Sequence, residues 1–246
     1  MNLEGKQAVI TGGTGGMGRA VTRELLARGC SVLAAGGVAA EVDDANADPA
    51  MEGADIRLLD VTDDDAVVSL FAGLDRLDIL INLAGIGRGP AEFEPAGFAR
   101  TVDVNLLGTM RSCYAAFDLL RQDGGGAVVN TASMMSFFGS GSAPAYAASR
   151  GGVMQFTKSL AIAWAPDGIR VNAIAPGWID TPQTQPIIEN DRRRQAVIDR
   201  TPLGRWGTPD DVAPCFVFLA SPESRFVTGV ILPVDGGYLV DGSPKG

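Results

Sequence analysis

Short apolar runs alternate along the chain with longer stretches whose apolar residues recur at helical spacing. Short apolar runs of this kind are typical of buried strands. Strands separated by helices pair in parallel, so the pattern predicts an α/β fold with a doubly wound, parallel sheet flanked by helices. The seven predicted strands cover residues 7–11, 31–35, 55–59, 79–82, 127–131, 170–175 and 230–234.

Helix start and stop signals support this alternation. Residues 19–28 carry apolar positions at helical spacing and stop at Gly29. Thr62 precedes three aspartates, which is the pattern of an N-cap with acids in the first turn. The segment 36–53 is small, acidic and interrupted by proline, so at most a short or frayed helix is expected there. Further helices are predicted over residues 98–122, 146–165, 187–200 and 210–219.

Residues 181–207 form a proline-rich, charged segment after a predicted strand end. In an open α/β sheet this is the usual place for a loop that covers the substrate. A long surface connection is the alternative. With no linker and no internal repeat in the sequence, residues 1–246 are predicted to form one domain.

Composition places the chain among soluble globular proteins, with 46% hydrophobic and 20% charged residues. Cys30, Cys113 and Cys215 are scattered and lack metal-ligand spacing, so we expect reduced thiols, a cytoplasmic protein and no metal site. The N-terminus lacks the apolar core of a signal peptide, and no apolar run reaches the roughly 18 residues of a membrane span.

The net charge of −9 is concentrated between residues 41 and 65, where ten acids accompany one base, Arg57. We interpret this region as a solvated acidic face. Phosphate binding would need clustered Lys and Arg, so a nucleic-acid partner is disfavoured. The one basic cluster, Arg192 to Arg194, is expected to face solvent.

Proton chemistry in this chain must be carried out without histidine, which is absent. Tyr146 and Arg150 lie four residues apart, so a helix places both on one face. A phenol with an ordinary pKa of about 10 is a poor acid or base at neutral pH, and a fixed cation nearby favours its anion. Tyr146 is therefore a candidate acid and base.

A glycine-rich turn links the first predicted strand to the first helix, with glycines at positions 12, 13, 15, 16 and 18. Strand, turn and helix in this order predict dinucleotide binding, because backbone N–H groups can approach a pyrophosphate closely; a tight turn alone is the alternative. At the end of the second strand, Gly36 stands where an acid would hold the ribose of NAD. The acids that follow favour NAD over NADP, unless Arg19 or Arg57 folds inward.

Together these motifs resemble the short-chain dehydrogenase/reductase family over nearly the whole chain, which implies a Rossmann-type fold. The matching motifs are Thr11-Gly12-x3-Gly16-x-Gly18, Asp60-Val61, Asn82-Leu83-Ala84-Gly85, Val104-Asn105, Ser133, Tyr146 and Pro176-Gly177-x-Ile179-x-Thr181. The resemblance implies binding of NAD or NADP by Gly12, Thr14, Gly16, Met17, Gly18, Gly36, Asp60, Val61, Asn82, Ala84, Gly85, Tyr146, Arg150, Pro176, Gly177, Ile179 and Thr181.

The resemblance also implies hydride transfer between the nicotinamide and a secondary alcohol or ketone. Tyr146 would be the acid and base, Ser133 would position the substrate oxygen, and Asn105 would hold water of a proton relay. The chain departs from the family at Arg150, where the Tyr-x-x-x-Lys pattern has lysine. Arginine can hold the ribose and favour the tyrosinate, but it does not release a proton readily.

Two other hypotheses explain Arg150. The chain could be a catalytically impaired dinucleotide-binding subunit with a regulatory or structural role, or the arginine could have been introduced into a lysine-bearing parent.

Apolar residues near the predicted site favour an apolar or aromatic small-molecule substrate, although they could instead pack beneath the loops: Met134, Met135, Phe137, Phe138 and Trp178. Residues 235–237 and the predicted helices 98–122 and 146–165 resemble the family's assembly surfaces. A homotetramer or homodimer is therefore implied.

Overall fold

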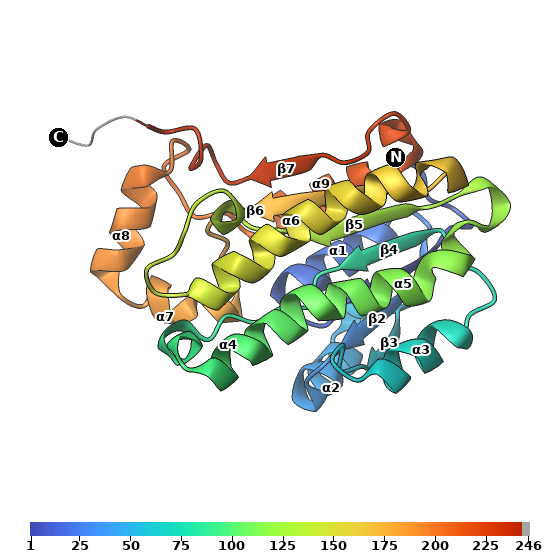
Figure 1. Cartoon of the computed structure of the whole chain (residues 1–246), viewed down its shortest axis with the longest axis horizontal. Helices are drawn as coiled ribbons and strands as arrows, with labels where there is room; N and C mark the ends of the chain where they lie inside the picture. Colours follow the sequence, from blue (N-terminus) through green and yellow to red (C-terminus); the bar gives the residue numbers. More distant parts are fainter. Residues whose placement is uncertain (243–246) are drawn as a thin grey trace.

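The structure is a computed structural model that describes residues 1–242, and its centre is a seven-stranded sheet (Figure 1). The strands are β1 (Gln7–Thr11), β2 (Ser31–Gly36), β3 (Asp55–Leu58), β4 (Ile79–Asn82), β5 (Ala127–Thr131), β6 (Arg170–Pro176) and β7 (Ile231–Val234). All neighbours are parallel, in the order β3-β2-β1-β4-β5-β6-β7. The predicted fold class is confirmed. The direction of winding reverses between β1 and β4.

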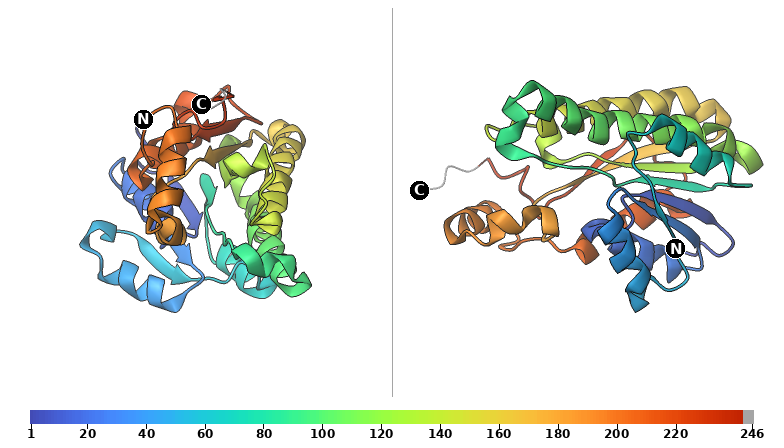
Figure 2. Two further views of the ribbon diagram at one scale, coloured as in Figure 1. Left: turned by 90° about the vertical axis from the view of Figure 1, so that its left-hand side faces the viewer. Right: turned by 90° about the horizontal axis from the view of Figure 1, so that it is seen from below.

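Helices cover both faces of the sheet (Figure 2). One face carries α1 (Gly16–Leu26), α2 (Ala39–Ala47) and α9 (Pro209–Ala220). The other carries α3 (Asp64–Ala72), α4 (Pro95–Val102), α5 (Gly108–Leu120) and α6 (Pro144–Trp164). Successive strand residues point to opposite faces, so Ala8 and Ile10 join the core beneath α1 and α9 while Val9 joins the core beneath α5.

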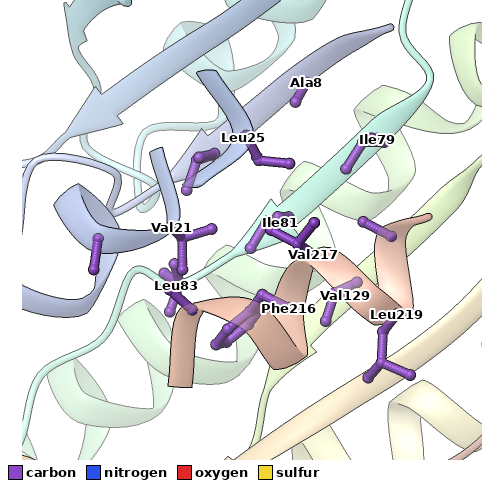
Figure 3. Packing of buried hydrophobic residues seen from close by; sticks show 14 of the residues in the cluster. Ala8, Val21, Leu25, Ile79, Ile81, Leu83, Val129, Phe216, Val217 and Leu219 are labelled. Atoms are coloured by element: carbon purple, nitrogen blue, oxygen red, sulfur yellow. The ribbon is translucent and has the colours of Figure 1, made fainter. Parts of the chain in front are cut away.

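The core between α1, α9 and the sheet fixes the helix that begins at the glycine turn (Figure 3). Val21 of α1 and Phe216 of α9 are both fully buried against β4, where Ile81 points to the same side. Truncating a fully buried Phe costs about 3–5 kcal/mol, because a cavity remains. This packing therefore holds the start of α1 firmly under the carboxyl end of the sheet.

The helix predicted over residues 98–122 is found, but it is not a regular α-helix throughout. A π-helical turn, Asp103–Leu107, lies between α4 and α5. Within this turn Asn105 is fully buried, and its side chain is hydrogen-bonded to both backbone groups of Ile86. These bonds hold the turn against the chain that follows β4, and π-turns of this kind occur frequently at functional sites.

Three smaller predictions also change. Segment 36–53 contains the regular helix α2, followed by a 3₁₀ turn at Pro49–Met51. Asp63, not Thr62, caps α3 and accepts the N–H of Ala66, because the N–H and hydroxyl of Thr62 are both bonded to Asp60. The predicted helix 187–200 divides into α7 (Gln185–Ile188) and α8 (Asp191–Arg200), which lie beyond the carboxyl ends of the strands (Figure 1).

Arg192 to Arg194 on α8 are exposed, as predicted. Further 3₁₀ turns occur at Gly89–Phe93, Gln122–Gly124, Met134–Ser136, Ala165–Asp167, Pro182–Thr184 and Pro222–Ser224. Within residues 1–242, no helix combines the length and the apolar character needed to cross a membrane.

Candidate active site

A cavity of about 610 Å³ opens at the carboxyl end of the sheet beside β1 and β4, where the winding reverses. This is the usual ligand position in an open α/β sheet. Many residues predicted from the dinucleotide motifs line it: Gly12, Thr14, Gly16, Met17, Gly18, Gly36, Asp60, Val61, Ala84, Gly85 and Thr181.

The glycine turn after β1 is built so that side chains cannot fit. Gly12 has a φ of +74°, and a Cβ there would lie 2.5 Å from the backbone nitrogen of Ala84. A Cβ on Gly18 would lie 2.0 Å from the carbonyl oxygen of Gly12. The helix α1 that follows has no side-chain cap at its N-terminus. Its free N–H groups and dipole therefore suit a phosphate in the cavity.

Thr14 takes the space at the end of β2. A Cβ on Gly36 would lie 2.0 Å from the Thr14 hydroxyl, so a larger residue at position 36 would displace the threonine. The hydroxyl oxygen is buried and has no hydrogen-bond partner in the described part of the chain. Since buried polar groups are normally satisfied, this orphan hydroxyl fits a site that receives a polar ligand.

Acidic residues dominate the cavity beyond Gly36, where Glu41, Asp44 and Asp60 line it. The two cations there are engaged. Arg19 donates to the carbonyl oxygens of Thr14 and Glu41, and Arg100 donates to Asp60. Burial would raise the pKa of Asp60, but hydrogen bonds from Thr62 and Arg100 outweigh it and hold that pKa below its usual range.

Arg57, the other cation that could have turned inward, instead pairs with the exposed Asp55. It is not among the residues that line the cavity.

Tyr146 and Arg150 lie on one face of α6, as their spacing predicts. The guanidinium carbon of Arg150 lies 5.3 Å from the centre of the Tyr146 ring, in a cation–π arrangement. Arg150 is only 4% exposed, and its Nη1 donates to the carbonyl oxygen of Thr131 at 2.7 Å. Its Nε is buried without a partner, and no carboxylate within residues 1–242 forms an ion pair with it.

Gly85 makes room for the long side chain of Arg150. A Cβ at position 85 would lie 1.9 Å from Nη2 of Arg150. The guanidinium therefore lies between the chain after β4 and the end of β5, as a buried charge with a free donor. A buried charge without a partner is costly, which favours a site completed by a ligand that accepts hydrogen bonds.

Asn105 supports this end of the cavity from the π-turn. Its Oδ1 accepts the N–H of Ile86 at 2.8 Å, and its Nδ2 donates to the Ile86 carbonyl at 2.9 Å and to the Ser149 hydroxyl at 3.1 Å. Its own carbonyl accepts the hydroxyl of Thr109. Asn105 thus joins α6, the π-turn and the loop after β4, while a role in a water relay stays a prediction.

Ser133 lies two residues after the end of β5 and caps the short turn Met134–Ser136. Its hydroxyl oxygen accepts the N–H of Met135 at 3.1 Å, and the side chain is almost fully buried. The hydroxyl proton has no acceptor in the described chain and remains free to be donated.

Six residues of the predicted cofactor set do not line this cavity: Asn82, Tyr146, Arg150, Pro176, Gly177 and Ile179. Of these, Arg150 lies directly behind Gly85, which does line it. Asn82 is 1% exposed and accepts the hydroxyl of Thr11, while its amide donates to Asn130. It therefore ties neighbouring strand ends together. Ile179 and Trp178 line a separate cavity of about 190 Å³.

The residues predicted to line a substrate pocket differ in their exposure. Met134 is 2% exposed and belongs to the core, whereas Phe137 is exposed and Phe138 is half-buried.

Glu92 is the residue that sequence analysis missed. It is 1% exposed, and its Oε2 accepts the backbone N–H of Tyr146 at 2.9 Å. The two residues are 54 positions apart, so no local pattern could indicate the contact. Within residues 1–242, no cluster of histidine, cysteine or acidic side chains could hold a metal ion.

Comparison with known proteins gives consistent matches along almost the whole chain. A family model described as enoyl-(acyl carrier protein) reductase matches residues 12–239. A 2-dehydro-3-deoxy-D-gluconate 5-dehydrogenase from Pseudoalteromonas atlantica is 37% identical, with 97% of each chain covered. A cis-4-hydroxycyclohexanecarboxylate dehydrogenase from Sinomonas cyclohexanicum is 38% identical, over 94% of this chain and 95% of the other.

Solved structures agree with these matches. A candidate 2-deoxy-D-gluconate 3-dehydrogenase from Agrobacterium tumefaciens, crystallised with bound NADP, superposes with a TM-score of 0.86 at 38% identity. The superposition covers 97% of this chain and 98% of that one.

Proposed function

The chain belongs to the short-chain dehydrogenase/reductase family, and we propose that it transfers a hydride between a nicotinamide dinucleotide and a secondary alcohol or ketone. It is thus an oxidoreductase of the class that acts on CH–OH and C=O groups. The observation that carries the proposal is that Arg150, stacked on Tyr146, lies directly behind Gly85, which lines the same cavity as the glycine turn.

The cavity fits a dinucleotide in three respects. Gly12, Gly16 and Gly18 leave the backbone open, and the free N-terminus of α1 would hold the pyrophosphate. Thr14, with its orphan hydroxyl, lines the cavity, and Arg150, with its orphan Nε, lies directly behind the lining residue Gly85. When bound, the nicotinamide ring supplies or accepts the hydride.

Tyr146 would exchange a proton with the substrate oxygen while charge develops there. Ser133 would donate its free hydroxyl proton to the same oxygen. Arg150 would hold the nicotinamide ribose and stabilise negative charge on the phenol oxygen, because its guanidinium lies over the ring and is shielded from water. Arginine stays protonated at every working pH, so the proton must reach solvent without being released by residue 150. We propose water near Asn105 for that path.

NAD is the form of the cofactor that we propose. Glu41 and Asp44 line the cavity beyond Gly36 and would repel an added 2′-phosphate, and Arg19 is already hydrogen-bonded to two carbonyl oxygens. The relative from Agrobacterium tumefaciens holds NADP, so both forms belong in the assay.

We propose a small-molecule substrate that is apolar or aromatic, contacted by Phe137 and Phe138. Residues 181–207 would cover it, since Thr181 and Pro182 already lie over the glycine turn, within 3.1 Å of a Cβ placed on Gly16. We also propose that the chain assembles as a homodimer or homotetramer, because large side chains such as those of Tyr114 and Ile162 are exposed on α5 and α6.

A specific observation supports a second candidate function. The lysine of the family pattern is replaced by Arg150, which lacks an easily released proton. A dinucleotide-binding subunit without catalysis would retain the cavity and the glycine turn. Comparing Arg150→Lys with the natural chain separates the two candidates.

The test is a panel of secondary alcohols and ketones followed through nicotinamide absorbance with NAD(H) and NADP(H). The panel includes sugar acids and cyclic hydroxy acids, which the names of the relatives suggest. We expect turnover in the natural chain, a lower KM for NAD(H), and a loss of at least about 100-fold in Tyr146→Phe. Absence of turnover above that variant would contradict the proposed function.

A further inference from the structure

Glu92 is a buried carboxylate to which the proposed chemistry assigns no task. It is 1% exposed, in the 3₁₀ turn Gly89–Phe93, and within residues 1–242 it forms no ion pair. A charge in this position is costly unless hydrogen bonds stabilise it. Its surroundings supply two: Oε1 accepts the N–H of Arg88 at 2.8 Å, and Oε2 accepts the N–H of Tyr146 at 2.9 Å.

The bond to Tyr146 caps helix α6 from a distant part of the chain. Tyr146 is the third residue of the helix, so its N–H has no partner within the helix, and Ala143 provides no side-chain cap. The carboxylate also lies at the positive end of the helix dipole, which stabilises its charge. Glu92 therefore fixes the backbone from which the phenol of Tyr146 projects.

The second hydrogen bond of Glu92 helps to fix residues 86–88, which form a wall beside that phenol. Arg88 follows Gly87, and a Cβ on Gly87 would lie 3.5 Å from Cδ2 of the Tyr146 ring. On the other side of Gly87, the backbone of Ile86 is held by Asn105. Residues 86–88 are thus anchored at both ends, and Glu92 ties one end to Tyr146 itself.

We propose that Glu92 is a positioning residue that sets the place of Tyr146 relative to this wall, and hence relative to the substrate oxygen. The proposal rests on the proposed function, because it assumes that Tyr146 exchanges the proton. Misplacing a reacting group slows the chemical step and leaves binding at other parts of the site unchanged.

The test is Glu92→Gln, with Glu94→Gln as the matched control. Both remove one negative charge, but Glu94 is exposed and its side chain has no hydrogen bond to Tyr146. Glutamine has nearly the shape of glutamate but only one acceptor oxygen. Its NH₂ group must therefore face one of the two backbone N–H donors, that of Arg88 or that of Tyr146. We expect kcat to fall by about 10- to 100-fold in Glu92→Gln, with KM for the dinucleotide and the unfolding midpoint close to those of the control.

Two results of this comparison would overturn the proposal. One is a kcat within about twofold of the Glu94→Gln control. The other is a joint loss of kcat, dinucleotide affinity and stability, which would indicate a purely structural role. If the glutamine variant does not fold, Glu92→Asp keeps the charge but is one methylene too short to hold both donors. Its kcat should then fall by at least about fivefold.

Amide hydrogen exchange tests the positioning role of Glu92 independently of the proposed catalytic function, because the measurement needs no substrate. The Tyr146 amide should exchange at least about tenfold faster in Glu92→Gln than in Glu94→Gln. Unchanged exchange at Tyr146 would refute the positioning role even in a chain that proves active. Faster exchange would support it even if no substrate is found.

Discussion

Arg150 is a buried cation whose only hydrogen bond in the described structure goes to a backbone carbonyl, that of Thr131. Lysine has a single flexible ammonium, whereas arginine presents a planar fork, and the fork needs space. Gly85 provides that space, since a Cβ there would meet Nη2 at 1.9 Å. Gly85, the last residue of the Asn82-Leu83-Ala84-Gly85 motif, therefore has a second role in this chain, which is to leave space for the guanidinium.

This dependence predicts a coupling between positions 85 and 150. Gly85→Ala should lower the free energy of unfolding by about 1–3 kcal/mol, because the added methyl group overpacks the guanidinium. In an Arg150→Ala background the same change should cost less than about 1 kcal/mol. Urea unfolding of the natural chain, the two single variants and the double variant measures the difference. Equal costs in both backgrounds would show that the guanidinium does not occupy this space.

At the scale of elements, α9 shows how a local cap supports the core. Thr208 caps the helix and accepts the N–H of Asp211, and Asp211 accepts the N–H of Thr208 in return. Arg205 also donates to Asp211. The hydrogen bond from Arg205 is the main cause that lowers the pKa of Asp211, followed by the bond from the Thr208 backbone.

The sign of the resulting pH dependence follows from this lowered pKa. The folded state binds the Asp211 proton more weakly than the unfolded state, so the carboxylate contributes stability above about pH 4 and loses it as the pH falls below that value. Asp211→Asn should therefore cost about 1 kcal/mol at pH 7, and the difference from the natural chain should shrink below about pH 4.

Urea unfolding at several pH values measures the effect. The control is Asp65→Asn, which removes an exposed acid from the first turn of α3 that caps nothing. A cost that stays constant down to low pH would contradict the assigned role of Asp211.

A helix, strand or turn could be predicted from the sequence where the residues that determine it are close together along the chain. The strands are marked by apolar runs and the glycine turn by its own residues, and both are found at the predicted positions. The π-turn at Asp103–Leu107 is not indicated by the sequence, because it is held by contacts of Asn105 with Ile86, which lies nineteen residues away. The α2 helix was underestimated because its acidic, weakly amphipathic sequence hides a small buried side formed by Val42 and Ala45.

At the scale of the whole molecule, the site is assembled from the helix layers on both faces of the sheet. The glycine turn begins α1 on one face, while Tyr146 and Arg150 come from α6 on the other. The family pattern indicated most of the residues around the cavity. It did not indicate Glu92, and it included Asn82, whose side chain joins strands in the interior. Such roles depend on which segments the fold brings together, which spacing along the chain does not encode.

The central claim is that this fold catalyses hydride transfer with arginine in the place of lysine. The most direct test is kcat of the natural chain beside Arg150→Lys, on the best substrate of the panel and at one pH. The account predicts measurable turnover in both, within about tenfold of each other, because the guanidinium performs the electrostatic work of the ammonium. An inactive natural chain that gains activity by several orders of magnitude in Arg150→Lys would contradict it and identify a dinucleotide-binding protein that does not catalyse.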